Sequence, residues 1–195
     1  MWNDLIEEFT KYVNQKNLPI SSEVTHSFFE TNSFLLKNRP TLIEYSAFFG
    51  SIQIYQYLWL NHVYLSPSLC LHSIHGRNPD LIHLFEEDHV YPPDDSYEIC
   101  LKESIKCHHN EFASYIIDNL LDQKIEESNQ ENKFDVNIFS YCFHYYNYSY
   151  FPSNLDNKFF LYYLCKYDYL SLIEFLLSTE ELDLNKTVVW INENS

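Results

Sequence analysis

Glycine is almost absent from the sequence, which has two glycines in 195 residues. Because β-sandwiches and β-barrels use glycine in their tight turns, both of these all-β classes are disfavoured. Loops that cradle phosphate also need glycine where the backbone approaches the ligand. No Walker loop, dinucleotide-binding fingerprint, nucleophile elbow or zinc-finger pattern occurs either. The composition therefore favours an all-α fold and gives no support to nucleotide chemistry.

Basic residues are also few. Lys and Arg together number 12 against 28 Asp and Glu, which gives a formal net charge of −16, and the only arginines are Arg39 and Arg77. Nucleic acids and anionic membrane surfaces attract basic patches, so neither is an expected partner. Net negative charge often serves solubility alone, but it is also compatible with a basic protein partner.

The cysteines and the N-terminus give no sign of secretion. The cysteine count is odd and no pair has CxxC spacing, which favours reduced, mostly buried thiols in a cytosolic protein. Asp4, Glu7 and Glu8 lie where a signal peptide needs an apolar core. The uncharged stretch 45–76 is interrupted by polar residues, so core helices are favoured over a membrane span. The sequence predicts a cytoplasmic protein, with the nucleus as an open alternative. The cysteines are Cys70, Cys100, Cys107, Cys142 and Cys165.

The best-defined stretch in the chain is 40–64. Thr41 and Glu44 have the spacing of a capping box, in which each side chain satisfies a backbone N–H at a helix start. Gly50 follows at a position typical of the left-handed residue that ends a helix, and apolar residues at helical spacing resume over 52–59. The stretch predicts two short antiparallel helices, which need neighbours because a single pair cannot bury both apolar sides.

This helix pair recurs along the chain. A shift of 27 residues places 54–58 on 81–85, and Asn61-His62-Val63-Tyr64 on Asp88-His89-Val90-Tyr91, with an identical His-Val-Tyr. A third copy begins near Tyr97, with 104–108 in the place of 46–50. The predicted repeats span about 39–66, 67–94, 95–133, 134–157 and 158–186, of which the fourth is degenerate. The last residues, 187–195, are expected to be the start of an incomplete repeat.

The remaining segments are also assigned. Over 1–38 the pattern predicts two helices, 2–15 and 21–37, that together cover the open end of the array. The polar stretch 121–133 is expected to be an exposed loop or a frayed helix end. Within the fourth and fifth repeats, helices are expected over 137–150 and 170–177.

Several of these motifs resemble the ankyrin family. The sequence TLIEYSAFFGS, residues 41–51, is similar to the ankyrin signature T-P-L-H-x-A-A-x-x-G-H, with matches at Thr41, Ala47 and Gly50. Glu44 stands where the family has histidine, and the capping box formed by Glu44 can replace the role of that histidine. The ending Leu-Leu followed by Leu-Asp-Leu-Asn at 182–185 also resembles an ankyrin repeat. The phrases at 43–60, 101–109 and 162–177 are similar to a divergent ankyrin-like domain expanded in certain parasitic protists.

The resemblance covers roughly 39–186 and implies an ankyrin-like helical-repeat solenoid. The spacing of 27 residues is shorter than the family's roughly 33, so short or absent β-hairpin fingers are expected. The implied function is a non-catalytic protein–protein interaction scaffold without a cofactor. Two alternatives stay open: a structural fragment of a longer repeat protein, and a Cys/His enzyme.

Ankyrin arrays bind partners on a concave face made of inner-helix ends and inter-repeat loops, and the resemblance assigns candidates to both. Each candidate could equally pack against the next repeat, and for Tyr64 and Tyr91 packing is favoured over binding. The helix-end candidates are Phe48, Phe49, His75, Lys106, Cys107, Lys166 and Tyr167, and the loop candidates are His62, Tyr64, His89 and Tyr91.

Two groups of residues have chemistry-bearing side chains without a recognised pattern. Cys107, His108 and His109 contain the side chains of a Cys–His nucleophile, but adjacent residues on a helix point in different directions. His72 and His75 lie three apart on one predicted helix, and helical histidine pairs can bind zinc. No cysteine or carboxylate completes a recognised zinc pattern around them, so no metal site is predicted.

Overall fold

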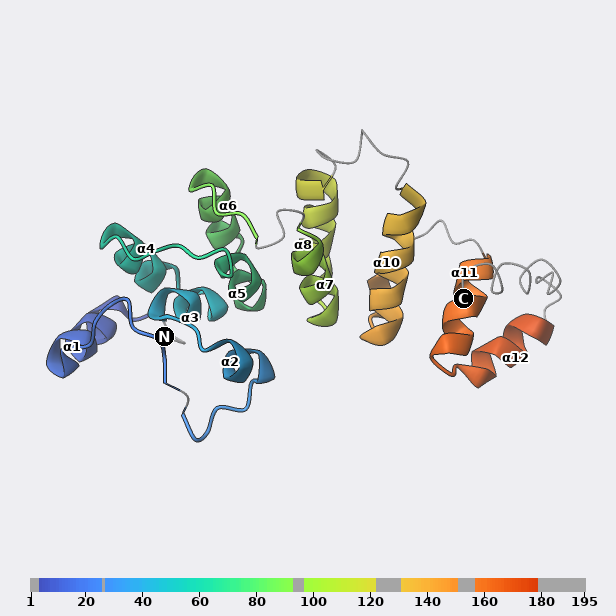
Figure 1. Ribbon diagram of the computed structural model, residues 1–195, viewed down its shortest axis with the longest axis horizontal. Helices are drawn as coiled ribbons and strands as arrows, with labels where there is room; N and C mark the ends of the chain where they lie inside the picture. The colour runs from blue at the N-terminus through green and yellow to red at the C-terminus, as the bar shows by residue number, and fades with distance from the viewer. Residues whose placement is uncertain (1–3, 26, 93–96, 122–130, 151–156, 179–195) are drawn as a thin grey trace. The chain divides into compact units, whose positions relative to one another are not determined.

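The computed structural model describes residues 4–25, 27–92, 97–121, 131–150 and 157–178 (Figure 1). Within these ranges every regular element is a helix, and extended pairing is limited to one isolated antiparallel bridge between Glu23 and Thr41. The predicted all-α class is therefore confirmed. The chain divides into two compact units, unit 1 (Met1–Leu121) and unit 2 (Asp122–Ser195).

Unit 1 contains three successive helix pairs. Within the pairs α3 packs against α4, α5 against α6 and α7 against α8; between the pairs α3 contacts α5 and α5 contacts α7. The elements of unit 1 are α1 (Ile6–Lys16), α2 (Ser33–Asn38), α3 (Leu42–Phe48), α4 (Ile52–Leu60), α5 (Leu69–Gly76), α6 (Pro79–Glu87), α7 (Glu98–Lys106), α8 (Asn110–Tyr115) and the π-helical turn η1 (Ile116–Leu121).

The predicted helix pair at 40–64 is confirmed in its local chemistry. The Glu44 backbone N–H donates to Thr41 Oγ1 at 3.4 Å, and the Thr41 N–H donates to Glu44 Oε2 at 2.8 Å, which completes the capping box. Ser66 also donates to Glu44 Oε1 at 2.6 Å, and Ser68 donates to the same oxygen. Glu44 therefore joins the start of α3 to the segment that leads into α5.

A left-handed residue ends each inner helix of the three pairs. Gly50, Arg77 and His108 follow α3, α5 and α7 with φ of 65°, 51° and 57°. His62 and His89 take the same conformation after α4 and α6, with φ of 60° and 54°. The positions predicted from the sequence shift thus share one backbone geometry, although their side chains differ.

Small residues let the inner helices approach one another. Ser46, Ser73 and Ser104 are fully buried at equivalent positions of α3, α5 and α7, and each hydroxyl donates to a carbonyl of its own helix. The two glycines meet at the α3–α5 contact. A Cβ on Gly76 would lie 2.3 Å from the Ala47 carbonyl oxygen and 2.8 Å from the Gly50 nitrogen. Glycine is therefore required here by backbone approach as well as by a turn.

The predicted helix over 21–37 is wrong, because only Ser33–Asn38 is helical. Backbone bonds from Val24 N–H to the Pro40 carbonyl and from Leu42 N–H to the Ser22 carbonyl hold residues 22–24 extended beside the start of α3. The side chain of Asn32 then accepts from two backbone N–H groups and begins α2. Apolar periodicity was overridden here by pairing with a distant segment.

The first helix begins at Ile6, later than the predicted residue 2, and α1 packs against α4. Asp4 lies just before it, and its carboxylate accepts from the backbone N–H groups of Gln53 and Ile54 at 2.8 and 3.0 Å. Asp4 thus caps α4, whose own N-cap Ser51 makes no side-chain cap bond.

Unit 2 is described at 131–150 and 157–178, and its helices agree in part with the prediction. α12 matches the predicted 170–177, whereas α10 begins six residues before the predicted 137 and ends at His144. The predicted loop or frayed end at 121–133 lies mostly outside the described residues, as does the expected incomplete repeat from 187. A core of Phe139, Phe143, Tyr163 and Leu164 joins α10 to α11. The elements of unit 2 are α10 (Glu131–His144), the 3-10 turn η2 (Tyr148–Tyr150), α11 (Asn157–Lys166) and α12 (Leu170–Ser178).

The uncharged stretch 45–76 is divided among α3, α4 and α5, which have 7, 9 and 8 residues. A helix needs about 20 apolar residues to cross a bilayer. None of the helices in the described part of the chain combines the length and the apolar character for such a span. The prediction of separate core helices is confirmed.

Candidate functional site

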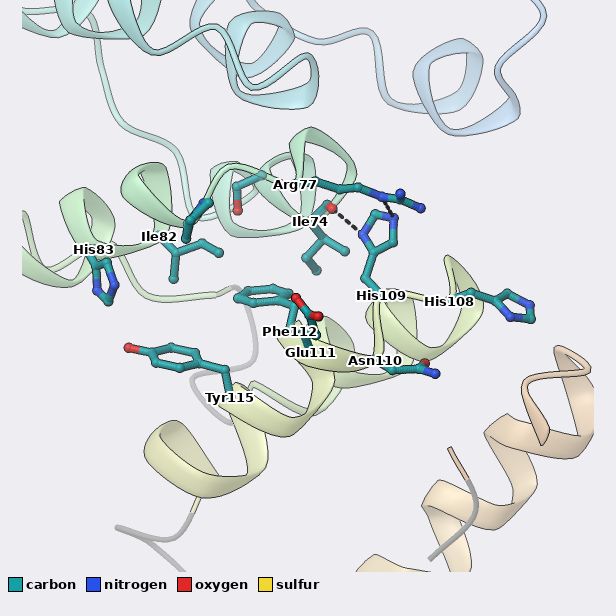
Figure 2. Close-up of a pocket in the computed structure, with 12 residues that line it drawn as sticks. Ile74, Arg77, Ile82, His83, His108, His109, Asn110, Glu111, Phe112 and Tyr115 are labelled. Carbon is teal, nitrogen blue, oxygen red and sulfur yellow. Dashed lines mark hydrogen bonds between the residues drawn. The ribbon is translucent and has the colours of Figure 1, made fainter. Parts of the chain in front are cut away.

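A groove of about 530 Å³ opens in unit 1 between the α5–α6 pair and α8. Figure 2 shows the Phe112 ring directed toward Ile82 and Ile74, with Tyr115 and His83 at one end and Arg77 and His109 at the other. The groove therefore has an apolar floor between two polar ends. Its lining residues are Ser73, Ile74, Arg77, Pro79, Ile82, His83, His108, His109, Asn110, Glu111, Phe112 and Tyr115.

One end of the groove is fixed by His109. Its Nδ1 lies 2.6 Å from the Ile74 carbonyl oxygen, and the Arg77 Nε–H donates to its Nε2 at 2.6 Å. The two bonds are compatible with a neutral ring protonated at Nδ1. Burial, with a contribution from the Arg77 charge, lowers the pKa of His109, so the ring stays neutral at physiological pH. This end of the groove therefore holds one cation, Arg77, oriented by an uncharged histidine.

The other end is fixed by Tyr115. Its hydroxyl donates to the Glu86 carboxylate at 2.8 and 3.0 Å, which ties α8 to α6. Burial and the Glu86 carboxylate raise the pKa of Tyr115 to about 12, so the hydroxyl remains a donor. The apolar floor thus lies between two contacts that join one helix pair to the next, His109 to the Ile74 carbonyl and Tyr115 to Glu86.

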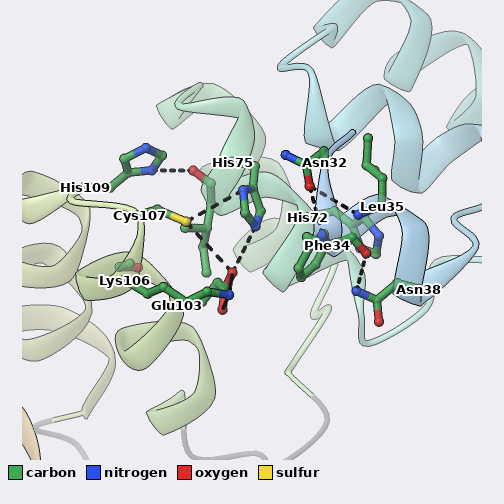
Figure 3. A network of polar contacts seen from close by, with 12 residues as sticks. Asn32, Phe34, Leu35, Asn38, His72, His75, Glu103, Lys106, Cys107 and His109 are labelled. Atoms are coloured by element: carbon green, nitrogen blue, oxygen red, sulfur yellow. Dashed lines mark hydrogen bonds and ion pairs between the residues drawn. The ribbon is translucent and has the colours of Figure 1, made fainter. Parts of the chain in front are cut away.

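A second cluster lies at the α5–α7 junction (Figure 3). Cys107 Sγ is 3.7 Å from His75 Nδ1 and 3.9 Å from Glu103 Oε1, and His75 Nε2 is 3.2 Å from the same oxygen. No hydrogen bond of standard geometry joins Nε2 to that oxygen despite their approach. Lys106 Nζ donates to both carboxylate oxygens at 2.8 and 2.9 Å. The cluster is the one group of three potential metal ligands found among the described residues.

The charges of this cluster are unequal. Burial alone would raise the pKa of Glu103, but the adjacent His75 and Lys106 outweigh burial and lower it to about 2. Burial and the Glu103 charge raise the pKa of Cys107 to about 11, so the thiol is protonated at neutral pH. A protonated thiol is a poor nucleophile, and the histidine beside Cys107 is His75, from another helix.

Phe48 and Phe49, the predicted helix-end residues of the first pair, pack against other parts of unit 1. Phe48 is 7% exposed, and its ring stacks on Phe34 and His75 with centroids 5.9 and 4.7 Å apart. Phe49 packs its ring against Phe48 and Tyr45 and is only partly buried. For Phe48 the alternative of packing against the next repeat is therefore the observed one.

The predicted loop residues are exposed. Tyr64 is 78% and Tyr91 is 54% exposed, so the packing favoured for these two tyrosines is wrong. The burial falls instead on the preceding Val63 and Val90, whose backbone N–H groups close the helix-ending turns at His62 and His89. A buried valine followed by an exposed tyrosine therefore recurs at the same place in successive pairs.

The last two predicted residues lie in unit 2. Tyr167 is half-buried and stacks on Phe143 with centroids 6.0 Å apart. Lys166 is exposed, with its Nζ 5.6 Å from the centroid of the Tyr163 ring. Both residues thus belong to the aromatic layer of α10 and α11.

The sequence interpretation missed part of the second cluster and the whole floor of the groove. It named His75, Lys106 and Cys107 in the second cluster without Glu103, and it named none of the groove floor. Glu103 and Cys107 are four residues apart, a spacing that places them on one helix face, so this half of the cluster was detectable. The approach of His75 depends on the α5–α7 packing, which no local pattern encodes.

Comparison with known proteins adds no relative to this picture. No family model, curated protein or solved structure gives a significant match to the chain. The similarity to ankyrin repeats therefore stays a prediction from the motifs.

Proposed function

We propose that the chain is a non-catalytic protein-binding module. An ankyrin-like array of helix pairs in unit 1 holds a segment of a partner protein in the groove between the α5–α6 pair and α8. The groove between two polar ends is the observation that carries the proposal. Binding sites commonly combine an apolar lining with a few fixed polar groups that set orientation. Phe112 and Ile82 supply the apolar contact, and Arg77 and Tyr115 supply the polar groups.

The size of the groove indicates the kind of ligand. At about 530 Å³ it falls within the roughly 300–1,000 Å³ of ordinary ligand pockets. It can hold two or three side chains of a peptide, with the rest of the peptide on the surface. A bound segment would place an apolar side chain over Phe112 and an acceptor group near Arg77.

The exposed tyrosines offer a second contact area. Tyrosine is enriched in protein interfaces because its rigid ring brings a large contact area at a small entropic cost. Tyr64 and Tyr91 occupy equivalent loop positions, and His89 stacks on Tyr91 with ring centroids 6.4 Å apart. Equivalent exposed aromatics in successive pairs suit a partner that lies across several repeats.

The net charge of −16 points to the charge of the partner. Opposite net charges accelerate protein association and make its rate depend on salt. A basic partner is therefore expected. Only the part of its bound segment that reaches Arg77 is expected to carry a carboxylate or carbonyl acceptor.

Selection from a random peptide library by the purified chain tests this proposal. Selected peptides should bind saturably, and Phe112→Ala should weaken them at least about tenfold, as expected for a central aromatic anchor. Leu60→Ala is the matched control, since this exposed apolar residue lies on α4, outside the groove. The proposal is wrong if the folded Phe112→Ala protein retains full affinity, or if no peptide binds saturably.

A purely structural role is the second candidate, and α12 favours it. Four large apolar residues of this helix are exposed, a pattern typical of a surface that packs against another element. A stable monomer with no tendency to associate through this surface would count against that role. The four residues are Leu170, Leu172, Phe175 and Leu177.

A further inference from the structure

The cluster at the α5–α7 junction has the residue types of a transition-metal site. Glu103 lies on α7, and Cys107 is the residue directly after this helix. His75 lies in the last turn of α5. With one ligand atom from each residue, all three atoms lie within 4.8 Å of one another. We propose that His75, Glu103 and Cys107 bind a divalent transition-metal ion of the zinc type, which joins the second helix pair to the third.

The sulfur distances are close to those of tetrahedral coordination. A zinc ion with bonds of about 2.3 Å to sulfur and about 2.0 Å to nitrogen or oxygen places the sulfur about 3.5 Å from each of the other two ligand atoms. Cys107 Sγ lies 3.7 Å from His75 Nδ1 and 3.9 Å from Glu103 Oε1, whereas the 3.2 Å approach of Glu103 Oε1 is to the other ring nitrogen, Nε2. With Nδ1 as the histidine ligand, rotation of the Glu103 carboxylate toward Nδ1 would bring one atom of each residue around a single ion.

The ligand set selects the kind of metal. Thiolate and imidazole favour zinc and similar ions, whereas magnesium and calcium prefer sites made entirely of oxygen. Three protein ligands leave one tetrahedral position for water. The His75 and Glu103 side chains are each 13% exposed, so the site is sheltered yet open on one side.

The surroundings already hold the ligands in place. One side of the His75 ring packs against Phe34 and Phe48, with centroids 4.4 and 4.7 Å away. This packing limits the rotation of the ring and reduces the entropy lost on coordination. Figure 3 shows His75 between this aromatic side and the Glu103–Cys107 side.

Lys106 is the competitor for the metal. It donates to both oxygens of Glu103, and its side chain is 41% exposed, so it can move into solvent when an ion binds. Replacing Lys106 with glutamine removes a nearby positive charge and this competition. The geometry therefore predicts tighter metal binding by the Lys106→Gln protein, by about threefold.

Calorimetric titration of the full chain with Zn²⁺, together with Co²⁺ absorption, tests the site. We expect one ion per chain, thiolate-to-cobalt charge transfer, and a rise of roughly 5 °C in Tm at saturating Zn²⁺. Cys107→Ser should weaken binding by more than about 100-fold, because altering a mere supporting residue already costs about 10- to 100-fold. Cys165→Ser, which removes an exposed thiol in unit 2, should leave the affinity unchanged.

Two further variants keep the test decisive if Cys107→Ser disturbs folding. Glu103→Gln should weaken binding as well, and Lys106→Gln should strengthen it, a gain that general damage to the fold would not produce. The proposal is overturned if no saturable binding occurs, or if binding is lost in Cys165→Ser but kept in Cys107→Ser. The groove residues do not contribute ligands, so failure here would leave the peptide-binding proposal standing.

Discussion

The contact between Gly50 and Gly76 gives the sharpest prediction about stability. In Gly76→Ala the new methyl group would lie 2.3 Å from the Ala47 carbonyl oxygen and 2.8 Å from the Gly50 nitrogen. Both obstacles are backbone atoms, which cannot rotate away as a side chain can. The ends of α3 and α5 would have to separate by about 1 Å to restore an ordinary contact distance.

The size of the effect follows from two opposing contributions. Forcing extra volume into a packed region costs about 1–3 kcal/mol, and rigid backbone neighbours place this site near the upper end. Alanine would itself favour the helix over glycine by about 1 kcal/mol. The free energy of unfolding should therefore fall by roughly 2 kcal/mol, equivalent to a Tm lower by about 5–10 °C for a unit of this size.

Urea denaturation followed by far-ultraviolet circular dichroism measures this change. Gln56→Ala is the control, because it places alanine at an exposed position of α4 where no backbone lies against it, and it should change the unfolding free energy by less than about 0.5 kcal/mol. A Gly76→Ala protein as stable as the wild type would refute the close approach of α3 and α5. A more stable one would show that helix propensity alone acts at this position.

Two further predictions concern the caps and turns. Burial opposes ionisation of Glu44, but hydrogen bonds from Ser66, Ser68 and Thr41 outweigh it and lower its pKa below the usual 4.5. The stabilisation by ionised Glu44 is complete above pH 4.5 and is lost as the pH falls below it. Between pH 6 and 3 the Glu44→Gln protein should therefore lose less Tm than the wild type, whereas the control Glu8→Gln, at an exposed position, should lose as much as the wild type. Equal losses of Tm in the wild type and both variants would contradict this prediction. His62 has a φ of 60°, a conformation that costs a side chain about 1 kcal/mol and glycine nothing. His62→Gly should therefore raise the unfolding free energy by up to about 1 kcal/mol in the same urea assay. A loss of stability would count against a strained turn.

The sequence predicted the features that depend on nearby residues. The capping box of Thr41 and Glu44 and the turn at Gly50 involve interactions within a few residues, and the structure confirms both. Positions related by the 27-residue shift share a left-handed backbone, at Gly50 and Arg77 and again at His62 and His89. The helix expected over 21–37 failed because pairing with the segment before α3 stabilises an extended path there. Apolar spacing reports a helical tendency, and it contains no information about such a distant partner.

The candidate sites were less predictable, for a related reason. Each site combines residues that are about 30 positions apart and meet only when one helix pair packs on the next. His75 reaches Glu103, and Ile82 faces Phe112, through the packing between pairs. The register of that packing is set by many small contacts, such as the buried Ser73, and no single motif reveals it.

The left-handed turns have a consequence for how freely this surface can change. Arg77, His108, His62 and His89 each redirect the chain, yet all four side chains are exposed. These exposed side chains are not packed in the core, so at these positions the path of the backbone depends on the left-handed conformation itself, which glycine adopts most easily. His62 and His89, which lie outside the groove, are natural sites for variation: a library of residues placed at these two turns would alter the chemistry of the surface while the buried layers beneath keep their spacing.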